Sequence, residues 1–162
     1  PTLQKKSQIL VFNKQNKGPV GPVEPYIDYL IKNNHEVKVL NYGEFNHQSF
    51  LLELQKSKLL IGFVTDESQG IAWAEAWACD VPTLIIKNDF HIQKGKKYRI
   101  STAPYLCKEN GLFFDDLDDF SKKFKFAISN LEKFQPREWI INNMSDEYSS
   151  LLLYNFIKNS SK

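Results

Sequence analysis

Two glutamates eight residues apart, Glu67 and Glu75, are the side chains of this chain best suited to chemistry. Glu67 follows an apolar run typical of a strand, and Glu75 lies in a run typical of a helix. Gly70, at the expected helix start, has no Cβ, so a phosphate can approach the backbone amides closely. A helix N-terminus attracts anions, and carboxylates accept hydrogen bonds from hydroxyls. The segment therefore predicts a ligand with both phosphates and hydroxyls, such as a nucleotide sugar.

The residues around Glu75, from 71 to 78, are otherwise apolar, so we expect this helix to be buried on most faces. A lone buried carboxylate needs a partner, and a ribose diol is a suitable one. Two plainer interpretations stay open. In the first, Glu67 is a helix-capping carboxylate, and in the second, Glu75 is a solvated helix residue.

The elements that must position these glutamates alternate along the chain. Apolar runs predict strands at 8–13, 36–41, 58–65 and 82–86, and helical spacing predicts helices at 23–33, about 50–54 and 71–79. The run at 58–65 is nearly all apolar, which indicates a central strand covered on both faces. We therefore expect an α/β fold, a Rossmann-like doubly wound parallel sheet of four to six strands. Helices at 115–133, 138–143 and 146–158 are expected to pack against this sheet.

The simplest strand order is 2-1-3-4, with a fifth strand near 112–114. Ligands of such sheets bind where the strand order reverses, at the carboxyl ends of the strands. The loops 13–22 and 65–70 meet at that point. The first carries Lys14 and Lys17, and the second carries Glu67.

These residues also resemble a known family motif, which runs Glu67-Ser68-Gln69-Gly70-Ile71-Ala72-x-Ala74-Glu75 and is followed by Val81-Pro82-Thr83. It resembles the E-x7-E motif of retaining glycosyltransferases of the GT-B fold, similar to glycosyltransferase family 4. In that family the motif belongs to the C-terminal, donor-binding domain. The resemblance, from residue 8 to about 115, implies transfer of a sugar from a nucleoside diphosphate to an acceptor hydroxyl with retention of configuration, without a metal or another cofactor. It also implies a role in glycan or polysaccharide biosynthesis.

The resemblance implies a role for each matched residue. The first glutamate, Glu67, reaches the sugar hydroxyls, and the second, Glu75, reaches the ribose. The segment Ser68, Gln69, Gly70 and Ile71 holds the diphosphate and sugar through its amides. Lys14 and Lys17 match an Arg and a Lys that neutralise the departing diphosphate, although this loop has no arginine. Tyr42 and Gly43 match the loop that lines the nucleobase, and a plain strand-end turn is the alternative.

GT-B enzymes place the acceptor on a separate N-terminal domain. The 162 residues suffice for a single domain, 1–162, so we expect an excised half, a partner domain on another chain, or a domain that does not catalyse alone. A non-catalytic nucleotide-sugar-binding module, an epimerase of the same fold and a structural domain are the alternatives.

Composition sets further bounds. The formal net charge of +2 does not indicate a nucleic-acid binder. No apolar run is as long as a membrane span, so we expect a cytoplasmic protein, with peripheral membrane contact possible. Cys79 and Cys107 are expected to be reduced and partly buried, and a disulfide or a metal-binding pair is the alternative.

The remaining candidate sites are expected to be structural. The basic segment 94–99 is interpreted as a solvated loop, with a phosphate, an acceptor or an acidic membrane as alternatives. The acidic run 115–119 suits a helix first turn rather than a metal site. His35, His47 and His91 are expected at the surface, and Trp73 and Trp77 in the core. Residues 159–162 are expected to fray.

Overall fold

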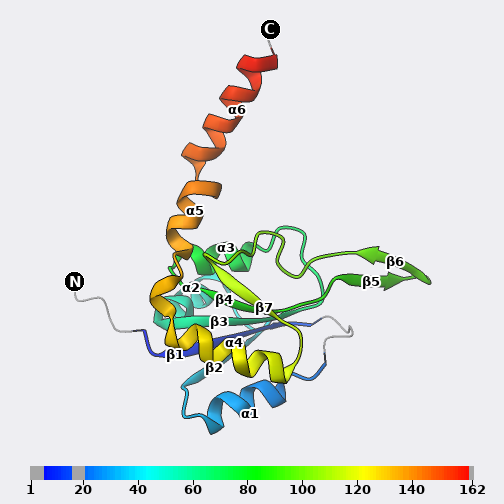
Figure 1. Ribbon diagram of the computed structural model, residues 1–162, viewed down its shortest axis with the longest axis vertical. Helices are drawn as coiled ribbons and strands as arrows, with labels where there is room; N and C mark the ends of the chain where they lie inside the picture. Colours follow the sequence, from blue (N-terminus) through cyan, green and yellow to red (C-terminus); the bar gives the residue numbers. More distant parts are fainter. Residues whose placement is uncertain (1–5, 16–20, 161–162) are drawn as a thin grey trace.

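The computed structural model describes residues 6–15 and 21–160, which contain a five-stranded parallel sheet (Figure 1). Its strand order is β2-β1-β3-β4-β7, and every neighbouring pair is parallel. The strands are β1 (Gln8–Lys14), β2 (Val37–Asn41), β3 (Ser57–Val64), β4 (Thr83–Ile86) and β7 (Gly111–Phe114). The α/β, Rossmann-like class, the order 2-1-3-4 and the fifth strand at 112–114 are therefore confirmed.

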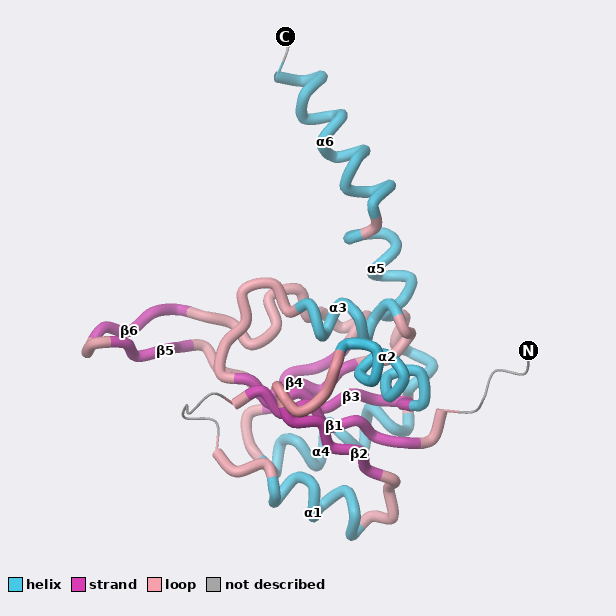
Figure 2. The backbone as a smooth tube through the Cα atoms, turned by 180° about the vertical axis from the view of Figure 1, so that it is seen from behind, coloured by secondary structure: helices cyan, strands magenta, loops and turns pink. Residues whose placement is uncertain are grey.

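Helices cover both faces of the sheet, so it is doubly wound. The helices are α1 (Glu24–Lys32), α2 (His47–Lys56), α3 (Ile71–Ala78), α4 (Leu117–Ser129), α5 (Pro136–Met144) and α6 (Asp146–Ser160). One core cluster joins the sheet to α1 and α4, and a second joins it to α2 and α3. Figure 2 shows these pairs of helices on opposite sides of the sheet. Because β3 lies between the two clusters, almost all of it is buried, as its apolar run predicts.

The C-terminal helices differ in how they pack. Helix α4 buries Phe120 and Phe124 in the first core cluster, and α5 packs across α3 through Trp139, whose ring centroid lies 5.3 Å from that of Trp77. Helix α6 has no buried residue among those described and extends away from the sheet (Figures 1 and 2). The expectation that this last helix packs against the sheet is wrong, because Ser145 adopts an extended conformation (ψ 159°) and redirects the chain.

A two-stranded antiparallel hairpin, absent from the expected elements, projects from the carboxyl side of the sheet (Figure 1). It consists of β5 (Phe90–Gln93) and β6 (Lys96–Arg99). The interpretation of 94–99 as a loop is therefore wrong, although the segment is solvated. Lys94 and Gly95 both have positive φ (49° and 74°), which is the geometry of a two-residue hairpin turn.

Three further expectations concern the start of α4, the end of the chain and membrane-spanning helices. Asp116 caps α4 by accepting a hydrogen bond from the Asp119 amide at 2.8 Å, so the acidic run serves the helix start. Asn159 and Ser160, expected to fray, are the last residues of α6, and 161–162 lie outside the described residues. None of the described helices combines the length and the apolarity that a transmembrane span requires.

Candidate functional site

The candidate site lies at the carboxyl ends of β1 and β3, where the strand order reverses. Lys14 is the last residue of β1, and Glu67 stands three residues beyond β3. Their side chains meet: Lys14 Nζ donates to Glu67 Oε1 at 2.6 Å, and both side chains are partly buried. The two loops that the sequence assigns to this edge thus bring a cation and a carboxylate into direct contact.

A cavity of about 480 Å³ opens at this edge between α2, α3 and the end of β1. Eight of the ten candidate residues line it: Lys14, Tyr42, Glu67, Ser68, Gln69, Gly70, Ile71 and Glu75. The cavity wall also includes residues that sequence reasoning did not select: Phe12, Phe45, His47, Phe50 and Ala72. Gly43 does not line it, and Lys17 lies outside the described residues. A cavity of this size is in the range of small-molecule sites.

Gly70 shapes the end of α3 that borders the cavity. It is the N-cap, with φ 71° and ψ 47°, and no side chain caps the helix. The Trp73 indole packs directly behind it: a Cβ built on Gly70 would lie 2.5 Å from Trp73 Cδ1. The Trp73 amide donates to Gly70 O at 2.9 Å, whereas the Ile71 and Ala72 amides at the start of α3 have no acceptor within the helix and are available to an anion. Glu67 is therefore not the capping carboxylate of this helix.

Glu75 lies on the exposed side of α3, not in a buried setting. Trp73, Ala76 and Trp77 form the buried face, whereas Ile71 is 64% exposed and the Glu75 side chain is 25% exposed. The expectation that α3 is buried on most faces is wrong for the side that carries Ile71 and Ala78, which are exposed, because α3 packs on the sheet along one side and α5 and α2 cover only parts of the rest. The burial of Trp73 and Trp77 confirms their expected place in the core.

The partner of Glu75 within the structure is His47, whose Nε2 lies 2.5 Å from Glu75 Oε1. His47 is the first residue of α2, and its side chain is 67% exposed. Sequence reasoning placed His47 at the surface but missed its position in the cavity wall. The available signal was Asn46, the N-cap whose Oδ1 accepts from the Ser49 amide and so fixes where α2 begins.

Aromatic rings form the wall opposite α3. Phe12 contacts Tyr42 and Phe45 edge to face, at centroid distances of 6.5 and 6.0 Å. Tyr42 itself is 59% exposed at the cavity rim, and Lys14 Nζ lies 5.1 Å from the centroid of its ring. An exposed ring beside a cation provides a flat apolar surface on which a planar base can stack.

Hydrogen bonds from a neighbouring segment hold the Glu67 loop in place. The Glu67 amide donates to Ser101 O at 2.9 Å, and Trp73 Nε1 donates to Thr102 O at 2.9 Å. Asn88 Nδ2 donates to Thr65 O at 2.8 Å on the other side of the loop. The loop therefore has a fixed shape, which reduces the entropy that a bound ligand has to remove.

Other titratable groups lie away from this cavity. Cys79 and Cys107 are free thiols, as expected, and burial raises the pKa of each. Burial also lowers the pKa of His35, with Lys58 adding to the effect. Among the residues that the structure describes, no group of three or more His, Cys, Asp or Glu side chains could hold a metal ion.

No protein-family model matches this chain, and no curated protein matches it either. The residues of the cavity therefore supply the chemical basis for assigning a function. They combine one cation, two carboxylates, a helix N-terminus and an exposed aromatic ring around a single space.

Proposed function

We propose that this chain is the donor-binding domain of a retaining glycosyltransferase and binds a nucleoside-diphosphate sugar in the 480 Å³ cavity. One observation carries the proposal: the Lys14–Glu67 pair, Glu75 and the start of α3, which no side chain caps, line one cavity. A diphosphate fits the helix end and the lysine, and the two carboxylates fit the hydroxyls of two sugars.

Each group has a distinct task in the proposed reaction. Glu67 accepts hydrogen bonds from the donor sugar, and Glu75 accepts them from the ribose in place of His47. As the acceptor oxygen forms its bond to the anomeric carbon, the bond from that carbon to the diphosphate breaks, the acceptor proton passes to an oxygen of the departing phosphate, and negative charge grows on that phosphate before the proton arrives. Lys14 Nζ and the amides of Gln69, Gly70 and Ile71 stabilise that charge. The proposal includes Lys17 as a second cation.

The nucleobase is proposed to stack near Tyr42, with Phe45 behind it. Tyr42 follows β2, on the same side of the cavity as Lys14, and both groups lie at the rim. A base in this position leaves the diphosphate over α3 and directs the sugar toward Glu67.

The proposal also includes an acceptor-binding domain, in the same chain or another. Tyr42 and Ile71 are largely exposed at the rim of the cavity, and none of the described residues closes it from above. A second domain over this rim would exclude water and bring the acceptor hydroxyl to the anomeric carbon. The two free, partly buried thiols fit a reducing compartment, so we propose a cytoplasmic location.

Thermal-shift and calorimetric titration with a panel of nucleoside diphosphates and nucleotide sugars tests the proposal. We expect at least one nucleotide sugar to raise the melting temperature and to bind more tightly than its nucleoside diphosphate. Lys14→Ala should weaken binding by about tenfold or more, because it removes a charge-assisted contact. Lys108→Ala is the charge-matched control, since Lys108 is almost fully exposed and does not line the cavity. No response to any nucleotide, or equal losses in both variants, would contradict the proposal.

A non-catalytic nucleotide-sugar-binding module remains the second candidate, favoured by the same cavity. A transfer or donor-hydrolysis assay with the chain alone, and again with a supplied acceptor domain, distinguishes the two. Product that disappears in Glu67→Gln supports the transferase. Tight donor binding without product under both conditions supports the binding module.

A further inference from the structure

The β5–β6 hairpin is the most positively charged segment of the described surface and is not part of the donor cavity. Its ten residues, 90–99, contain Lys94, Lys96, Lys97 and Arg99 and no aspartate or glutamate. None of these four cations forms a salt bridge within the part of the chain that the structure describes. The hairpin therefore presents uncompensated positive charge to a partner.

Cross-strand register places apolar and cationic side chains on the same face of the hairpin. Phe90 lies opposite Arg99, and Ile92 lies opposite Lys97. Directly opposed residues share a face, so these four side chains lie together. Lys97 Nζ sits 3.6 Å from the centroid of the Phe90 ring. Ile92 is 72% exposed, the most exposed of the large apolar side chains described.

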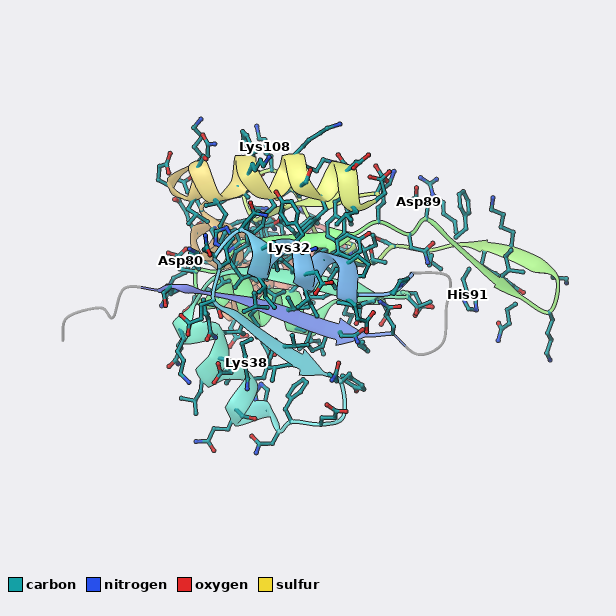
Figure 3. The ribbon with its side chains drawn as sticks, turned by 90° about the horizontal axis from the view of Figure 1, so that it is seen from below. Lys32, Lys38, Asp80, Asp89, His91 and Lys108 are labelled. Atoms are coloured by element: carbon teal, nitrogen blue, oxygen red, sulfur yellow. The ribbon has the colours of Figure 1, made fainter. Side chains whose placement is uncertain are left out.

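The hairpin extends beyond the body of the domain, so this face is accessible to a large flat partner (Figures 1 and 2). The nearby carboxylates lie at its base, where Asp66 pairs with His91 at 3.8 Å and Asp89 pairs with Lys87 at 3.2 Å. Figure 3 shows Asp89 and His91 at the root of the hairpin. The acidic groups are thus separated from the cationic tip.

We propose that this hairpin docks on a lipid bilayer that contains anionic headgroups. Lysine and arginine beside exposed aromatic and aliphatic side chains match the two layers of a bilayer interface, with phosphates outside and acyl chains beneath. A soluble polyanion can pair with the cations but has no apolar region in which to bury Ile92. A bilayer is therefore favoured over a nucleic acid or an acidic polysaccharide. This inference goes beyond the donor site and does not depend on it.

The hairpin is also held in a fixed position relative to the cavity. The Ile100 amide donates to Asp89 O at 3.0 Å and closes the base of the hairpin. The next residue, Ser101, accepts from the Glu67 amide at 2.9 Å. Docking of the hairpin would therefore set the orientation of the Glu67 loop relative to the membrane surface.

The test is co-sedimentation of the full chain with vesicles of phosphatidylcholine, with and without phosphatidylglycerol. We expect binding only to the anionic vesicles, weakened by added salt. Lys97→Glu with Arg99→Glu, the two cations on the face of Ile92, should weaken it at least about tenfold, because each cation near the surface contributes about fivefold. Lys122→Glu with Lys125→Glu is the charge-matched control on α4, where both side chains are exposed, and should have a much smaller effect.

Ile92→Ser separates the bilayer from a polyanion, since it keeps every charge of the hairpin. We expect it to weaken vesicle binding about fivefold and to leave binding to polyuridylate unchanged. Equal binding to neutral and anionic vesicles, equal losses in hairpin and control variants, or full vesicle binding by Ile92→Ser would each overturn the inference. So would tighter binding of the wild-type chain to polyuridylate than to anionic vesicles. Circular dichroism and nucleotide titration of the same variants verify their fold and report on the donor site separately.

Discussion

Lys14 Nζ lies 2.6 Å from Glu67 Oε1, although the two residues are 53 positions apart in the chain. The contact exists because β1 and β3 are adjacent parallel strands whose carboxyl ends reach the same edge. It neutralises two charges in a partly buried position and holds both side chains at the cavity. A ligand that enters the cavity meets a cation and a carboxylate that are already oriented.

Glu67→Gln is expected to remove the gain in affinity that the donor sugar adds. The variant loses a charged acceptor for sugar hydroxyls, an effect of about tenfold or more on nucleotide-sugar affinity. Affinity for the nucleoside diphosphate alone should stay the same or rise, because Lys14 is released from its ion pair. Isothermal titration with both ligands measures the difference. Glu132→Gln, an exposed carboxylate far along the chain in the 3-10 turn Leu131–Lys133, is the control.

Glu75→Gln is expected to weaken the nucleoside diphosphate and the nucleotide sugar by the same factor, about tenfold, because the ribose is common to both. Thermal stability should change little, since a contact as exposed as His47–Glu75 contributes at most about 1 kcal/mol. Titration and thermal melting of the same sample measure both quantities. A large loss of stability with unchanged affinity would assign Glu75 a structural role only. Equal losses for both ligands in Glu67→Gln as well would contradict the division of tasks between the two glutamates.

Gly70→Ala is expected to lower the free energy of unfolding by about 2–4 kcal/mol. The new methyl group meets the buried Trp73 ring at 2.5 Å, and the φ of 71° disfavours any Cβ. Gly95→Ala is the matched control: its φ of 74° is similar, but a Cβ there meets nothing within 4 Å. Gly95→Ala should lower the free energy of unfolding by only about 1 kcal/mol. Urea unfolding followed by tryptophan fluorescence measures both, and equal losses would show that backbone strain alone matters.

His35 is expected to make stability depend on pH. Burial lowers the pKa of His35 below its ordinary value of 6.5, because desolvation disfavours the charged ring, and Lys58 adds to the shift. The unfolded chain therefore binds the proton more readily. The contribution of His35 is fully present above pH 6.5 and is lost as the pH falls through the lower pKa of the folded state.

Urea unfolding of wild type and His35→Gln between about pH 7.5 and about pH 5 measures this effect. The free energy of unfolding should fall toward acid less steeply in the variant than in wild type. Glu53 and Asp119 also have lowered pKa values, from hydrogen bonds with Lys56 and Lys123 respectively, so their contributions are lost at still lower pH. Identical slopes in the two proteins would show that the His35 ring is protonated as readily in the folded state as in the unfolded state.

The sheet and most residues of the candidate site were predictable from the order of apolar and helical patterns along the chain. Alternating apolar runs and helical spacing sufficed for the strand order, because short crossovers leave few topologies for parallel strands. The same strand order predicts that Lys14 and Glu67 reach one edge of the sheet. The helical pattern that begins at Ile71 predicts that Gly70 stands at the start of α3.

Which helix faces are buried and which side chains pair could not be predicted, because both depend on how the elements pack against one another. Helix α3 is apolar almost all round, so periodicity did not reveal that Glu75 faces outward toward His47. The strands of the β5–β6 hairpin are only four residues long and mostly exposed: β5 alternates apolar and polar residues over just that length, and β6 has a single apolar side chain, so the pattern was too short to predict a hairpin. Helix α6 has an apolar composition but no buried residue, because burial depends on where the chain goes after Ser145 and not on composition.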